Sequence, residues 1–161
     1  MKLMASGLIV LALMTTNSGL LTAQSDPFVG TWMLNLSKSK YNNPAQAPKS
    51  QTRFAEPIEN GVKVRNEGVA PDGSAIANGW TLTYDGTDSP ITGPGMGNGA
   101  DTIATKRINS HTTVATLKRA GKVVTTARSV VSKDGKVMTI TLEGTDINGK
   151  QRNIVNVFDK Q

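Results

Sequence analysis

The chain has 161 residues, no cysteine, one histidine and a formal net charge of +6 at pH 7. Without cysteine it forms no disulfide, and one histidine is too few for a zinc site of the usual ligand composition. Aromatic residues make up 4% of the chain, too few for the stacking platforms of proteins that bind single-stranded nucleic acid. These properties exclude disulfide-stabilised and zinc-binding classes and argue against a nucleic-acid partner.

The first residues are typical of a secretory signal peptide. Lys2 supplies positive charge, residues 8–14 form a short apolar run, and Leu21-Thr22-Ala23 is a suitable cleavage site. The apolar run is far shorter than the roughly 18 residues that cross a bilayer, so we expect no transmembrane anchor. We predict a signal peptide over residues 1–23 and a single domain over residues 24–161, located in the periplasm or outside the cell. The alternative is a buried N-terminal helix.

Short stretches rich in Val, Ile and Thr follow, separated by turn pairs such as Asp72-Gly73, Asp134-Gly135 and Asn148-Gly149. Such pairs suit tight hairpins, and their regular recurrence indicates consecutive antiparallel strands. We predict strands at Phe28–Leu36, Lys49–Pro57, Gly61–Val69, Ala75–Tyr84, Asp101–Ile108, His111–Arg119, Lys122–Ser132, Lys136–Thr145 and Lys150–Phe158.

This pattern predicts an all-β fold, a single antiparallel up-and-down β-barrel of about 8–10 strands, because closing a meander removes its two exposed edges. A sandwich is the alternative. Two segments interrupt the pattern, Ser37–Pro48 and the glycine-rich Asp85–Ala100, where Ser89–Thr92 could add a short strand. Because long loops often carry function, we expect these two at the mouth of the barrel.

Catalytic and metal-binding patterns are sparse. His111 is the only histidine, and its neighbour Thr112 would point to the opposite face of a strand, so no nucleophile–base pair is evident. A lone histidine could bind haem, but an exposed turn position is the simpler interpretation. We predict no catalytic residue, no metal site and no cofactor.

The first predicted strand contains Gly30-Thr31-Trp32, and a Gly-x-Trp on the first strand resembles the first signature of lipocalins and their calycin relatives. The segments Asp26–Trp32, Leu34–Tyr41, Ala47–Thr52 and Val130–Lys136 resemble small secreted bacterial lipocalin-like proteins of unknown function. The resemblance implies that Gly30 and Trp32 are structural. It also implies that Trp32 packs at the closed end of the barrel against a late arginine, Arg128 or Arg152.

A barrel of this size can enclose one ligand. We therefore expect a non-enzymatic, monomeric binding protein for a small hydrophobic or amphipathic molecule. The predicted contacts are four wall residues and one anchor for a carboxylate: Trp80, Met138, Ile140, Phe158 and, as the anchor, Arg128.

Two other functions stay open. From Asp101 to Gln161 there are 11 basic and 5 acidic residues, so the protein could act as an envelope or extracellular interaction module through a basic outer surface. An enzyme built on the barrel is the third hypothesis.

Overall fold

Glycine turns divide the chain into the antiparallel strands that the sequence predicts. The turn between the strands Thr112–Arg119 and Lys122–Val131 shows the reason, because Ala120 and Gly121 both have positive φ (49° and 75°), as a tight hairpin requires. The computed structural model describes residues 26–161, so the predicted signal peptide lies outside the described residues. The elements are β1 (Gly30–Leu34), β2 (Lys40–Tyr41), the 3-10 turn η1 (Pro44–Gln46), β3 (Ser50–Ile58), β4 (Gly61–Val69), β5 (Ala75–Leu82), β6 (Asp85–Pro90), β7 (Thr102–Asn109), β8 (Thr112–Arg119), β9 (Lys122–Val131), β10 (Val137–Thr145) and β11 (Gln151–Lys160).

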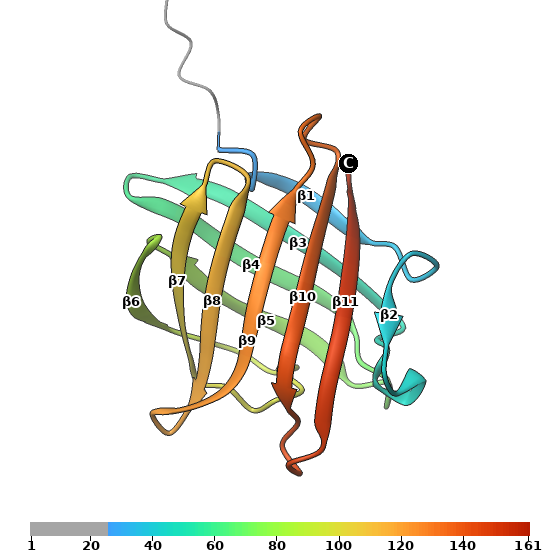
Figure 1. Cartoon of the computed structure of the whole chain (residues 1–161). Coiled ribbons are helices and arrows are strands. Elements are labelled where there is room, and N and C mark those ends of the chain that lie inside the picture. The colour runs from blue at the N-terminus through green and yellow to red at the C-terminus, as the bar shows by residue number, and fades with distance from the viewer. Residues whose placement is uncertain (1–25) are drawn as a thin grey trace, which may run out of the picture.

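The strands form one antiparallel sheet in the order β5-β4-β3-β1-β11-β10-β9-β8-β7-β6, with β2 paired to β11. Figure 1 shows this sheet curling into a barrel in which β1 lies beside β11, so both ends of the domain share one wall. The predicted all-β up-and-down barrel is confirmed. The described residues contain no helix long and apolar enough to span a membrane.

The barrel is nearly closed at the seam between β5 and β6. The segment after β6 runs against β5, where Gly79 and Thr92 exchange backbone hydrogen bonds of 3.0 and 2.9 Å. A Cβ on Gly93 would lie 2.0 Å from the carbonyl oxygen of Ala77, so only glycine permits this approach. The glycine-rich segment therefore closes the seam, and the strand within it is β6 rather than Ser89–Thr92.

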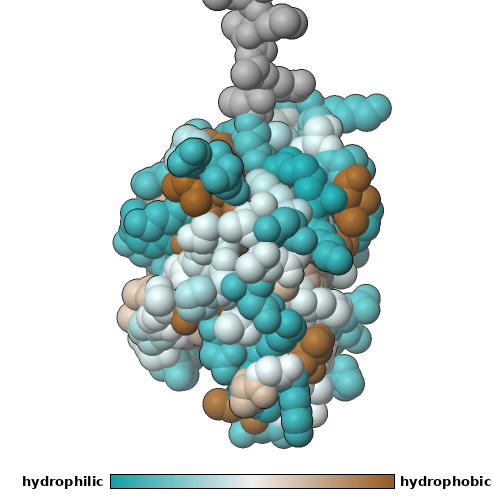
Figure 2. Space-filling view, turned by 90° about the vertical axis from the view of Figure 1, so that its left-hand side faces the viewer, coloured by the Kyte–Doolittle hydropathy of each residue, from teal (hydrophilic) through white to brown (hydrophobic). Residues whose placement is uncertain are grey.

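Figure 2 views the side of the barrel that carries β6 and β7. This face is mostly polar, and its hydrophobic side chains form small separate patches rather than one broad apolar surface. A large apolar patch would mark a docking surface, and this face shows none.

One end of the barrel is filled with side chains. Trp32 and Phe158 are fully buried, and the indole Nε1–H of Trp32 donates to the carbonyl of Phe28 at 3.0 Å. Lys160 Nζ lies 5.0 Å from the centroid of the Trp32 ring, so the cation against this ring is Lys160 and not Arg128 or Arg152. Gly30 has a φ of 134°, a backbone conformation that residues with a side chain rarely adopt, which explains glycine there.

The same end is sealed by a cluster around Arg107. Its guanidinium stacks 3.8 Å from the centroid of the Tyr84 ring and donates to the carboxylate of Asp26 at 2.5 Å. Burial and the nearby Asp26 carboxylate raise the pKa of Tyr84 well above its usual range. The cluster fastens the start of the described chain across the closed end.

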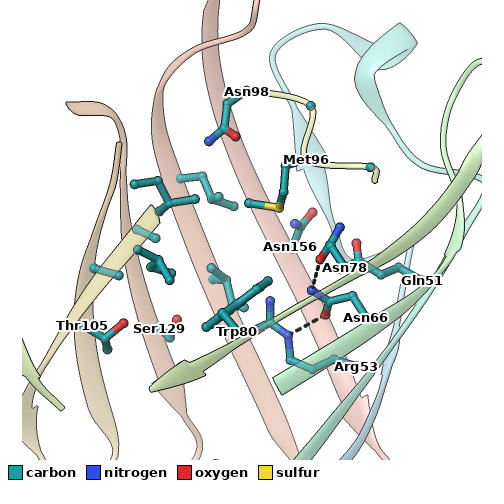
Figure 3. A pocket seen from close by; sticks show the side chains of 18 of the residues that line it. Gln51, Arg53, Asn66, Asn78, Trp80, Met96, Asn98, Thr105, Ser129 and Asn156 are labelled. Carbon is teal, nitrogen blue, oxygen red and sulfur yellow. Dashed lines mark hydrogen bonds between the residues drawn. The ribbon is translucent and has the colours of Figure 1, made fainter. Parts of the chain in front are cut away.

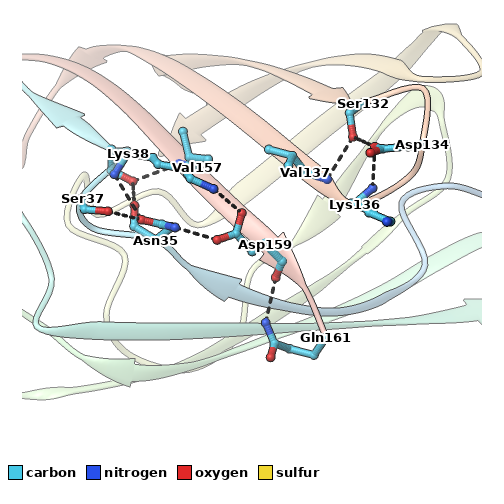
Figure 4. A network of polar contacts seen from close by, with 11 residues as sticks. Asn35, Ser37, Lys38, Ser132, Asp134, Lys136, Val137, Val157, Asp159 and Gln161 are labelled. Carbon is cyan, nitrogen blue, oxygen red and sulfur yellow. Dashed lines mark hydrogen bonds and ion pairs between the residues drawn. The ribbon is translucent and has the colours of Figure 1, made fainter.

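Asn35 joins the first strand to the last (Figure 4). Its amide donates to the carboxylate of Asp159 at 2.6 Å, while Ser39 Oγ donates to the Asn35 carbonyl and accepts the Val157 N–H. Lys38 Nζ lies 3.1 Å from the same carboxylate, and these contacts lower the pKa of Asp159. The network explains the polar segment that follows Leu34.

Asn35→Ala removes the side-chain contacts that tie the turn after β1 to β11. We expect the midpoint of thermal unfolding to fall by about 3–6 °C. Asn43→Ala is the matched control, because the Asn43 side chain is exposed and accepts only the Ala45 N–H. Differential scanning calorimetry that finds equal midpoints for the two variants would contradict this role.

Candidate ligand-binding site

Two adjoining cavities occupy the end of the barrel opposite the Trp32 core. The inner cavity has a volume of about 160 Å³ and the mouth cavity about 380 Å³. They share the lining residues Gln51, Met96 and Arg152, so a ligand could extend from one cavity into the other.

Both irregular segments line the mouth, as the sequence analysis expects. Ala45, Gln46 and Pro48 come from the segment that precedes β3, and Gly95 and Met96 from the loop that closes the seam. The loop is anchored by Asn98, which is 3% exposed, because its amide donates to Thr125 Oγ1 at 2.9 Å. The mouth is therefore bounded by two loops on one rigid barrel.

The inner cavity has two chemically different walls (Figure 3). Strands β7, β8 and β10 contribute a largely aliphatic wall that includes Ile103, Leu117 and Ile140, together with the hydroxyl groups of Thr105 and Thr113. Strands β3, β4, β5 and β11 contribute polar side chains, which Figure 3 shows gathered on one side: Gln51, Arg53, Asn66, Asn78 and Asn156. A ligand in this cavity would meet amide and guanidinium groups on one side and mostly hydrocarbon on the other.

A hydrogen-bonded relay orders the polar wall. Arg53 Nε donates to Asn66 Oδ1 at 3.0 Å, Asn66 Nδ2 to Asn78 Oδ1 at 2.9 Å, and Asn78 Nδ2 to the Pro94 carbonyl at 3.1 Å. Because a guanidinium can only donate, it fixes the orientation of both amides. The relay holds Arg53 in place and connects it to the loop at the mouth.

Arg53 is a cation inside the barrel without an acidic partner. Its guanidinium carbon lies 5.4 Å from the centroid of the Trp80 ring and 5.5 Å from that of Phe158, and the part of its surface not covered by protein lines the cavity. No salt bridge between described residues includes it. Burial lowers the pKa of Arg53 to about 10, so it is charged at neutral pH.

Further unpaired polar atoms lie around the same cavity. The indole Nε1 of Trp80, the hydroxyl of Thr105 and Nε of Arg152 are each buried without a hydrogen-bond partner among the described residues. Trp80 and Thr105 are only 8% and 4% exposed. Buried polar groups without partners are uncommon and costly, so their concentration here favours a site for a polar ligand.

The structure separates the five predicted ligand contacts into three groups. Trp80 and Ile140 line the inner cavity, whereas Met138 and Phe158 belong to the packed core at its base. Arg128, the predicted carboxylate anchor, lines neither of these two cavities. It is exposed on the outer face of β9, because Ala127 and Ser129 on either side of it point into the cavity and successive strand residues face opposite ways.

The lone histidine lies away from the cavities. His111 sits in the turn between β7 and β8, and its Nδ1 is 2.8 Å from Ser110 Oγ. Residues 26–161 contain no group of three or more His, Asp and Glu side chains that could hold a metal ion.

Sequence reasoning missed Arg53, Arg152 and the amide relay. One signal was available, because Asn66 has the same parity as the buried Val62 and Val64, and Asn78 the same parity as Trp80. Arg53 gave no such signal. Its neighbour Phe54 is the more obvious core residue, yet Phe54 lies outside, against Arg65 on the outer face.

Arg53→Met replaces an unpaired interior cation with an apolar side chain of similar length. We expect the free energy of unfolding to rise by about 1–2 kcal/mol, because the lost charge burial outweighs the acceptor left unpaired on Asn66. Chemical denaturation at neutral pH measures this free energy for the variant and for wild type. Above pH 10 the variant's stability advantage shrinks, because Arg53 of the folded wild-type protein loses its proton there and no longer buries a charge. The control is Arg128→Met on the outer face. An equal rise in the free energy of unfolding for this control, or a fall for Arg53→Met, would contradict the view that Arg53 is an unpaired interior cation.

No family model matches the sequence, and the comparison with curated proteins found no match. Among solved structures, the fold is similar to that of zebrafish ileal bile acid-binding protein complexed with cholic acid. The TM-score is 0.50 at 10% sequence identity, over 84% of this chain and 99% of that chain. At this identity the likeness shows the fold alone: the chain folds as a calycin-type barrel of the kind found in that binding protein.

Proposed function

We propose that this protein is an exported, non-enzymatic carrier of a small amphipathic organic anion, whose acidic group lies against Arg53. The observation that supports this most is the unpaired guanidinium inside the barrel. Its Nε is committed to Asn66, so its two terminal nitrogens are the donors left for a ligand. A carboxylate or sulfonate would accept from both in the bidentate geometry that arginine favours.

The cavity walls support an amphipathic ligand. The aliphatic side chains of β7, β8 and β10 offer apolar contact opposite the amide wall, and ligand pockets commonly combine such a surface with a few placed polar groups. The zebrafish protein with a similar fold is described as complexed with cholic acid, an amphipathic acid. That likeness supports a binding role for the same kind of interior.

The cavity volumes limit the ligand's size. An engineered cavity of roughly 150 Å³ holds benzene, so the inner cavity of about 160 Å³ suits one ring-sized group. Drug-sized ligands fill pockets of roughly 300–1,000 Å³, so a larger ligand would extend into the mouth cavity.

Binding is favoured over catalysis by what lines the inner cavity. Within residues 26–161, its lining includes two arginines but no Asp, Glu, Lys or His that could act as a general base at neutral pH. The apolar N-terminal run and the cleavage site before Gln24 support export.

Isothermal titration calorimetry with benzoate, decanoate and cholate tests the proposal on the domain of residues 24–161. We expect at least one of these acids to bind, and its neutral amide to bind at least about tenfold more weakly, since the amide has no charge to offer Arg53.

Arg53→Met should lower the affinity for that acid by about tenfold or more, whereas Arg128→Met should leave it unchanged. The Arg53 variant is expected to fold, so a loss of binding would not reflect unfolding. Equal affinity of wild type and Arg53→Met, or equal affinity for acid and amide, would contradict the proposal.

A further inference from the structure

The inner cavity is lined by a second arginine, Arg152. A ligand with one acidic group, bound to Arg53, would leave Arg152 without a partner. Arg152 comes from the start of β11 and lines both the inner and the mouth cavity, whereas Arg53 lines only the inner one. These two are the only charged side chains in the lining of the inner cavity within the described residues. Two cations therefore line one connected space, one deep inside and one at the mouth.

Arg152 is not satisfied by the protein around it. Its Nε is buried without a hydrogen-bond partner, and no salt bridge between described residues includes it. The carboxylate of Asp146 attracts the charge of Arg152, but Asp146 Oδ1 already accepts the backbone N–H groups of Asn148 and Lys150. Burial outweighs the attraction of Asp146 and lowers the pKa of Arg152.

The loop at the mouth leaves room for this guanidinium. A Cβ on Gly97 would lie 2.9 Å from Nη1 of Arg152, so the absence of a side chain at Gly97 allows the guanidinium to lie against the loop backbone. Gln51 and Asn156 line both cavities beside it and supply further hydrogen-bonding groups. Asp72 and Asp146 also line the mouth cavity, and the Oδ1 atom of each accepts hydrogen bonds within its own turn. Among the described residues, Arg152 is the one cationic side chain in that lining and therefore the group there that would attract a second acid.

We infer that the ligand is a dianion with two separated acidic groups, one held by Arg53 inside the barrel and the other by Arg152 at its mouth. The apolar middle of such a molecule would lie against the aliphatic wall that includes Leu142, which also lines both cavities. This inference rests on the proposed function, since it assumes that Arg53 takes an acid. It narrows the ligand class to dicarboxylates and their sulfonate or phosphonate equivalents.

The test compares straight-chain dicarboxylates, from butanedioate to dodecanedioate, with the monocarboxylate of each chain length. Calorimetry should show one spacing at which the dianion binds wild type about tenfold or more tightly than its monoanion, because the second acid gains a charge-assisted pair. NMR should show the Arg53 and Arg152 Nε–H signals both shifting with the dianion, and that of Arg53 alone with the monoanion.

Arg152→Gln should remove the dianion's advantage, so that the variant binds the dianion and its monoanion with affinities within about twofold of each other. Gly97→Ala keeps the charge but crowds the guanidinium, and it should reduce the same advantage. Arg119→Gln is the control, because Arg119 contacts the Ile147 carbonyl and lines neither cavity.

Dianions that bind no better than monoanions at every spacing would overturn the inference while leaving the proposed function standing. An advantage that survives Arg152→Gln, or that Arg119→Gln removes equally, would also overturn it. If neither class of acid binds wild type, the proposed function itself is wrong and the inference falls with it.

Discussion

Placing a guanidinium inside a β-barrel without a carboxylate to neutralise it imposes requirements on everything around it. Desolvation of an unpaired charge costs several kcal/mol, and the protein offsets only part of this. Asn66 accepts one N–H of Arg53, and the rings of Trp80 and Phe158 offer their faces to the cation. The remaining donors face the cavity. A protein selected for stability alone would place methionine or leucine there, and the proposed binding of an organic anion would offset the cost of the arginine.

The same arginine connects the interior to the way the barrel closes. The relay from Arg53 through Asn66 and Asn78 ends on the Pro94 carbonyl, which also accepts the backbone N–H of Ala77 across the seam. One carbonyl therefore serves both the polar wall of the cavity and the closure between β5 and the segment after β6. The glycines around Pro94 allow this close approach. Architecture and candidate site are thus built from the same short segment, and the cavities lie at the end opposite the packed Trp32 core.

Sequence reasoning predicts the fold better than the site, and the reason is physical. Turn pairs and alternating apolar residues mark strand boundaries locally, so the strands and the up-and-down order follow from short windows such as Val62–Val64. The cavity depends instead on strand parity combined with cross-strand register. Arg53 meets Asn66 only because β3 and β4 pair with those two residues opposite each other. A shift by one residue turns a wall residue outward, which is why Arg128 was expected inside and lies outside.

The central claim is that the interior cations exist to hold an organic anion. Native mass spectrometry of the wild-type domain, purified gently from the cells that produce it, tests this most directly when Arg53→Met is prepared in parallel. The account predicts an adduct on the wild type that is lost on denaturation, is identified as an organic acid, and is missing from the variant. The same adduct on both proteins would contradict it, as would a bare wild-type mass that persists after incubation with the organic acids extracted from those cells.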